Sequence, residues 1–358
     1  MNKSYRQSKW DFAKFFLMYM VIFGHVYNSP VSPTILRINV LSLMPSFFFI
    51  SGYFQSEIND FTDLTKKCKR TYHRIFLPLL TWGCILLLLT ITEIYLPQIV
   101  NSNYRNLLSF LKYTPYYILG ANWFLTSLLI CIFWGSLMSL FMNRFKRVGM
   151  MFLSLSPFIF VIYSPFIFEH YHFSFVWFFY TIGMLYKKFE KKLALFSESI
   201  ITKVAAIVIL IIVLLITEDF PMSRSFYYTE NQISTTPFGF IIYRWIASLA
   251  ASAIILFGII TYYNQHTGNK YLSKLSDYGK DTLFIYCSHM LVIKFVIYPY
   301  VLPFLPFNDG RPIIIFASIL LALLIAGLIY AILEGICIWC KKFSFTKTYL
   351  LGNRTVSA

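Results

Sequence analysis

Residues 312–339 of the chain read PIIIFASILLALLIAGLIYAILEGICIW, and almost every side chain in this stretch is apolar. A helix of about 20 predominantly apolar residues is long enough to cross the hydrocarbon core of a bilayer. The stretch therefore predicts a membrane-spanning helix, and the same length criterion can be applied to the rest of the chain.

The whole chain has a similar character. Of its 358 residues, 58% are hydrophobic, 20% are aromatic and only 13% are charged. A soluble domain carries roughly a quarter charged residues, so these side chains cannot coat a water-soluble globule of this size. The composition excludes a cytosolic enzyme, a secreted disulfide scaffold and a disordered chain.

The length criterion predicts ten spans, with no internal repeat among them. They lie near residues 12–29, 37–55, 75–96, 119–142, 148–167, 171–187, 202–217, 237–263, 282–303 and 312–339. Together they use roughly 200 residues, which leaves connections too short for a soluble catalytic domain. The sequence predicts an all-α, polytopic membrane helix bundle that forms a single domain over residues 1–358.

The basic residues predict the orientation of these spans. If the N-terminus is cytoplasmic, 24 of the 31 Lys and Arg fall at the cytoplasmic side, 5 fall in outer loops, and Arg244 and Lys294 lie within spans. Positive residues favour the cytoplasmic side and meet anionic lipid headgroups there. We therefore expect both termini in the cytoplasm and a location in the plasma (inner) membrane. The net charge of +16 does not indicate a nucleic-acid partner, because the basic residues form short clusters between apolar runs.

The first span carries three ionisable residues, Asp11, Lys14 and His25, on one helix face. Lys14 and His25 are separated by about 16 Å along the axis. Ionisable groups within a bilayer are costly, and each is a candidate functional residue. One interpretation makes Asp11 and Lys14 interfacial anchors and His25 a hydrogen-bonded bundle histidine. The other makes the stripe part of a site.

Two further segments allow a structural and a functional interpretation. The second span ends MPSFFFISGYF at 44–54, where Ser51 and Gly52 mark either a helix stop or an opening for close approach. Residues 66–82 read KKCKRTYHRIFLPLLTW. Arg70 and Arg74 are spaced i, i+4 there, which suits membrane anchoring or a cradle for a phosphorylated ligand.

Later polar residues give weaker signals. Trp123 is either an interfacial residue or part of a cavity, and His289 and Lys294 share the ninth span. Glu169, His170 and His172 lie in a short outer loop, where two imidazoles usually bond water. No metal site is predicted, and no HExxH, Walker, GxSxG or Rossmann motif is present.

In these features the sequence resembles the membrane-bound acyltransferase-3 family. They are, in the family's order, D-x-x-K-x10-H formed by Asp11, Lys14 and His25, MPSFFFISGYF at 44–54, RIFLPLLTW at 74–82, WFL at 123–125 and IYCSHMLVI at 285–293. The chain departs from the common pattern at Phe15, where many members have Gly, and at Met290, where Pro often follows the histidine.

The resemblance implies an integral-membrane O-acyltransferase that moves an acetyl group from cytoplasmic acetyl-CoA to a hydroxyl of a cell-surface or lipid-linked saccharide. It makes His25 the catalytic residue and assigns donor binding to Lys14, Arg70 and Arg74. Supporting or acceptor-side roles fall to Asp11, Ser51, Trp123 and His289. The expected partners are acyl-CoA, the saccharide acceptor and membrane lipids. No permanently bound cofactor and no metal are expected.

Two mechanisms and two competing functions are to be considered. His25 acts as a general base, or it carries the acetyl group covalently in a relay. The first competing function is a non-enzymatic exporter or flippase of a lipid-linked saccharide. Such transporters are typically built from repeats with helices broken at matching positions, which this sequence does not show. A membrane receptor or structural subunit is a third possibility.

Overall fold

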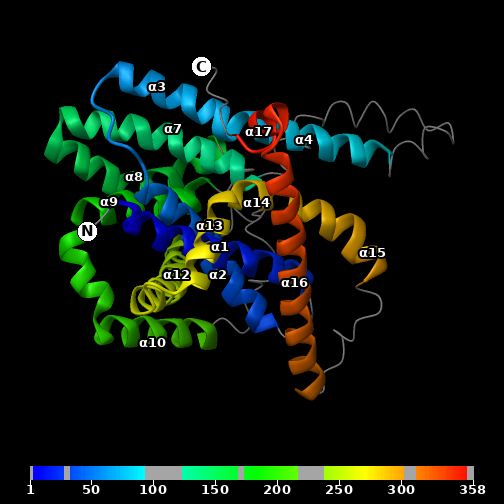
Figure 1. Cartoon of the computed structure of the whole chain (residues 1–358). Coiled ribbons are helices and arrows are strands. Elements are labelled where there is room, and N and C mark those ends of the chain that lie inside the picture. Colours follow the sequence, from blue (N-terminus) through cyan, green and yellow to red (C-terminus); the bar gives the residue numbers. More distant parts are fainter. Residues whose placement is uncertain are drawn as a thin grey trace.

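The computed structural model describes residues 3–27, 33–92, 123–167, 173–216, 238–301 and 312–352. These residues are helical almost throughout, and no β-strand occurs among them. Figure 1 shows the helices gathered around α1, with α16 running across one side of the bundle.

The elements follow one another along the chain, with short non-α turns inside two of the longer helices. They are α1 (Lys3–Val26), α2 (Pro33–Tyr53), α3 (Phe61–Thr71), the π-helical turn η1 (Tyr72–Phe76), α4 (Leu77–Thr90), α7 (Trp123–Arg144), α8 (Lys146–Ile167), α9 (Phe173–Glu198), α10 (Ile200–Ile216), α12 (Phe238–Gln265), α13 (Lys270–Tyr278), the 3₁₀ turn η4 (Gly279–Asp281), α14 (Thr282–Val292), the π-helical turn η5 (Ile293–Ile297), α15 (Tyr298–Tyr300), α16 (Pro312–Cys340) and α17 (Ser344–Tyr349).

Each of the ten predicted spans falls on helix over most of its described residues. Among the described residues, five helical stretches are long and apolar enough to cross a membrane: Phe61–Leu89, Trp123–Arg144, Arg244–Gln265, Lys270–Tyr300 and Ile313–Cys340. Two shorter apolar stretches are Leu41–Tyr53 and Ile200–Ile212. The all-helical, membrane-spanning class is therefore confirmed, whereas the number ten and the cytoplasmic termini stay predictions.

Helix α1 lies at the centre of the packing. It contacts α2, α12, α13, α14 and α16. Its buried hydrophobic side chains lie on more than one face: Trp10, Phe12, Ala13, Leu17, Met18, Val21, Ile22, Phe23 and Val26. A helix that is apolar around its circumference belongs in the interior of a bundle. The described part of α1 therefore lies within the bundle rather than on its surface.

Prolines explain the two π-helical turns. Pro78 follows η1 and Pro299 follows η5 at the same offset, and neither has an N–H to donate to the carbonyl four residues earlier. In both places the bonding shifts by one residue: Leu77 N–H donates to the Tyr72 carbonyl, and Tyr298 N–H donates to that of Ile293. The helices thus continue past proline, as membrane helices commonly do.

Helices α2 and α9 cross at two glycines. A methyl group at Gly52 would lie 1.9 Å from the Tyr180 carbonyl oxygen, and one at Gly183 would lie 2.1 Å from that of Phe49. Small residues let helix backbones approach in this way. The close approach predicted at Ser51 and Gly52 is therefore made by another helix. The hydroxyl of Ser51 donates back to the Phe47 carbonyl at 2.8 Å within α2.

We expect Gly52→Ala to destabilise the protein by about 1–3 kcal/mol, because the added methyl forces the α2 and α9 backbones apart. Thermal unfolding in detergent measures the effect. Gly335→Ala in α16 is the matched control, since the methyl it adds would meet no described atom beyond its own turn of helix within 4 Å. Equal melting temperatures for the two variants would contradict the close crossing.

Candidate active site

Two histidines from different helices meet near the end of α1. His25 lies in the last turn of α1 and is half-buried, and His289 lies in α14 and is 2% exposed. Their ring centroids are 5.4 Å apart, and the ring planes are inclined by 47°. The structure thus brings together two of the predicted site residues that are far apart in the sequence.

The hydrogen bonding of His289 identifies its tautomer. Its Nδ1 lies 2.6 Å from the carbonyl oxygen of Tyr286, one turn earlier in α14. A carbonyl oxygen can only accept a hydrogen bond, so Nδ1 carries the proton. In a neutral imidazole, Nε2 then presents a lone pair. Nε2 is buried and has no hydrogen-bond partner among the described residues.

Aromatic rings connect the histidine pair to α7 and α2. The ring of Tyr286 packs 5.6 Å from that of His289 and 4.8 Å from that of Phe124 at the start of α7. Phe124 also packs against Phe48 of α2 at 5.0 Å, and its neighbour Trp123 is half-buried. The Trp123 ring packs 6.3 Å from that of Phe124, so this predicted site residue belongs to the same group of aromatic side chains.

Asn39 is a candidate site residue that the motifs did not predict. This residue of α2 is buried, and its amide nitrogen would lie 3.3 Å from a methyl group placed on Gly24, next to His25. That nitrogen has no hydrogen-bond partner among the described residues. Burying an unpaired amide is costly, so an asparagine within an apolar stretch is the signal that could have identified it. Such a group can donate a hydrogen bond to a ligand oxygen.

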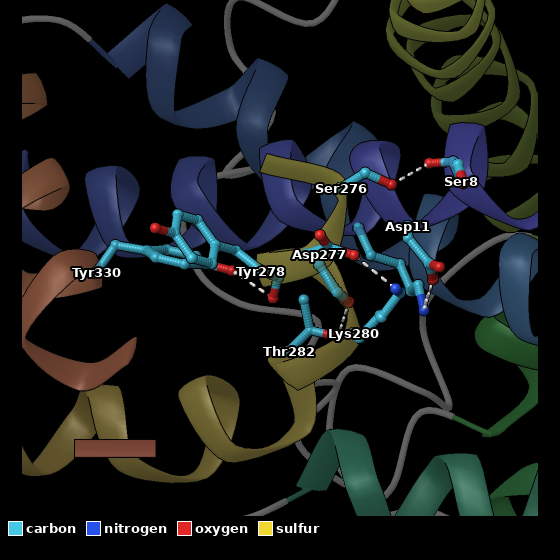
Figure 2. A network of polar contacts seen from close by, with 10 residues as sticks. Ser8, Asp11, Ser276, Asp277, Tyr278, Lys280, Thr282 and Tyr330 are labelled. Carbon is cyan, nitrogen blue, oxygen red and sulfur yellow. Dashed lines mark hydrogen bonds and ion pairs between the residues drawn. The ribbon is translucent and has the colours of Figure 1, made fainter. Parts of the chain in front are cut away.

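Asp11 and Lys14 form an ion pair with a 2.6 Å separation near the start of α1, and both side chains are partly exposed. Figure 2 shows this region, where the polar contacts of α13 and η4 lie against α1. The Ser276 hydroxyl donates to the Ser8 carbonyl at 2.6 Å. A methyl group at Gly279 would lie 1.8 Å from the Asp11 carbonyl oxygen, so η4 crosses α1 in direct contact with it.

Four cations form what we call the basic cluster: Lys67, Arg70, Arg74 and Lys187. Arg70 and Arg74 are exposed. The positive charges of Arg70, Arg74 and Lys187 all lie near enough to Lys67 to repel its ammonium group. Lys187 belongs to α9 and donates to the Gln55 carbonyl, just beyond α2, at 2.7 Å. The cluster therefore combines α3, η1 and α9, and its α9 member could not be predicted from the spacing of the arginines.

The basic cluster and the histidine pair lie toward opposite ends of α1. At the start of α1, the Trp10 ring packs 4.6 Å from that of Tyr53, at the end of α2. Gln55 follows two residues later and accepts the bond from Lys187. His25 lies about 22 Å further along the axis of α1 than Trp10. The structure does not bring the arginines into contact with His25.

The remaining polar candidates lie elsewhere. Arg244 of α12 is buried, with its guanidinium 5.0 Å from the Phe175 ring centroid, and Lys294 lies over Phe295. Glu169, His170 and His172 lie outside the described residues. No group of three or more His, Cys, Asp and Glu that could hold a metal occurs in the described part of the chain. A groove of about 320 Å³ between α10 and α12 is lined by none of the predicted site residues.

The apolar helices, five of them among the described residues long enough to cross a membrane, indicate a multi-pass membrane protein, and its helices bring two imidazoles together. The chain matches the model of the acyltransferase domain family, acyltransferase 3, over residues 7–331, and it belongs to that family. This confirms the resemblance found in the motifs. Comparisons with curated proteins and with solved structures give no match.

Proposed function

We propose that the protein is an integral-membrane O-acyltransferase that moves an acetyl group from cytoplasmic acetyl-CoA to a hydroxyl of a cell-surface or lipid-linked saccharide. The family supports acyl transfer in a membrane and favours an enzyme over a non-enzymatic exporter. The observation that carries the proposal is the pairing of His25 with His289 among the helices, at the opposite end of α1 from the basic cluster.

The basic cluster suits the donor. Coenzyme A carries several phosphate charges, and guanidiniums bind phosphate through paired, charge-assisted hydrogen bonds. Arg70 and Arg74 are exposed and can therefore reach a ligand in the cytoplasm. Lys14 is held by Asp11 at the same end of α1, where it can steady the donor's charge. The pantetheine arm then runs between the helices toward His25.

At the other end of α1, His25 acts as the general base. Its neutral imidazole takes the proton of the acceptor hydroxyl while the oxygen attacks the thioester carbonyl. The tetrahedral intermediate collapses by breaking the carbon–sulfur bond, and the imidazolium returns the proton to the departing thiolate. Half-burial of His25 limits competing water at the reacting carbonyl.

We expect His25→Ala to abolish acetyl transfer, a loss of at least about 100-fold, because the acceptor proton then has no base. Transfer of radiolabelled acetyl from acetyl-CoA to surface glycans in membranes measures it. The matched control is His266→Ala, which removes an exposed histidine at the end of α12. Normal transfer in the His25 variant, inserted at wild-type level, would remove His25 from the mechanism.

We also expect acetyl-CoA to raise the melting temperature of the purified protein, since a ligand that binds only the folded state stabilises it. Arg74→Ala should remove most of this shift by deleting a phosphate contact. Arg147→Ala, which removes an exposed arginine at the start of α8, should keep it. An undiminished shift in the Arg74 variant would place the donor elsewhere.

A further inference from the structure

His289, the second histidine of the pair, is arranged to accept a hydrogen bond. The bond from Nδ1 to the Tyr286 carbonyl fixes the ring of His289 to its own helix and leaves the Nε2 lone pair available. Leaving a buried acceptor without a donor costs about 1–3 kcal/mol. A structural histidine would be expected to satisfy both nitrogens, so an Nε2 without a partner among the described residues points to a bond that forms during function.

His25 is placed to supply that bond. Two imidazoles joined by an N–H···N bond of ordinary length have ring centroids about 5 Å apart, and the observed separation is 5.4 Å. The torsion that turns a histidine ring is broad, so a modest rotation of the half-buried His25 ring aligns one N–H with Nε2.

We propose that His289 is a positioning residue that accepts the N–H of His25 through Nε2 and thereby directs the other nitrogen of His25 at the acceptor hydroxyl. This inference rests on the proposed role of His25 as base. In this role His289, in the ninth predicted span, selects the tautomer of His25 and does not itself contact the substrate.

The bonds form a consistent chain of donors and acceptors. The acceptor hydroxyl donates to His25, His25 donates to His289, and His289 donates to the Tyr286 carbonyl. When His25 takes up the proton, its remaining N–H becomes a charged donor, and the bond to Nε2 strengthens. The chain thus stabilises the imidazolium when it forms, as a third group does for the base in other histidine-based sites.

A neutral imidazole is suited to this position. A carboxylate in the same place would carry a full charge into a site walled by the Tyr286 and Phe124 rings, and burying it would cost several kcal/mol unless it were paired. His289 provides an acceptor without that charge, which fits a residue that is 2% exposed within an apolar span.

Two substitutions separate positioning from packing. His289→Phe keeps a ring of similar size but has no acceptor, and it should lower kcat on the order of 100-fold with the KM for acetyl-CoA unchanged. His289→Gln keeps an amide donor for the Tyr286 carbonyl and an oxygen acceptor near Nε2, so it should recover at least about tenfold of that loss. Ser288→Ala is the matched control, since its buried hydroxyl donates to the Phe284 and Ile285 carbonyls of its own helix.

Steady-state acetyl transfer by the full-length protein in detergent or membranes measures all of these variants. Wild-type kcat in His289→Phe would overturn the inference. An equal loss in His289→Gln and His289→Phe would overturn it as well, because the role would then be packing alone. If His25→Ala itself stays active, the proposed function fails first; if only His25→Ala is inactive, the function stands and the positioning role is wrong.

Discussion

The structure depends on the cost of placing ionisable and amide groups within an apolar environment. Helix α1 carries Asp11, Lys14 and His25, which lipid would not accommodate without compensation. The bundle lowers this free-energy cost because other helices surround α1 and separate it from lipid. These helices are α2, α12, α13, α14 and α16. Near the start of α1, Lys14 pairs with Asp11. Toward its end, His25 packs against another imidazole.

This enclosure divides α1 into two chemical regions. Its start lies beside η4 and near the basic cluster, whose guanidiniums are exposed. Its end lies among aromatic rings, next to the buried groups His289 and Asn39. One helix therefore runs from a region of exposed cations to a region of buried imidazole, amide and aromatic side chains. The buried apolar side chains between them keep the two regions at a fixed spacing.

The sequence predicts the local structure well, because helix formation and membrane spanning depend on continuous runs of apolar residues. It also predicts that Asp11 and Lys14 share a face, since helical spacing alone determines this. It does not predict that His289 meets His25, that Lys187 joins the arginines, or that Asn39 lies beside Gly24. Each of these depends on which helices are neighbours, and packing of the whole bundle decides that.

The close crossing of α2 and α9 also determines where nearby charged side chains lie. The two helices touch at Gly52 and Gly183. Close to this crossing, Lys187 donates a hydrogen bond to the Gln55 carbonyl. The Tyr53 hydroxyl donates to Glu190 at 2.9 Å. A larger residue at position 52 or 183 would push the two helices apart and strain the bond between Lys187 and the Gln55 carbonyl. Two uncharged glycines thus help to hold a cation of the basic cluster in place.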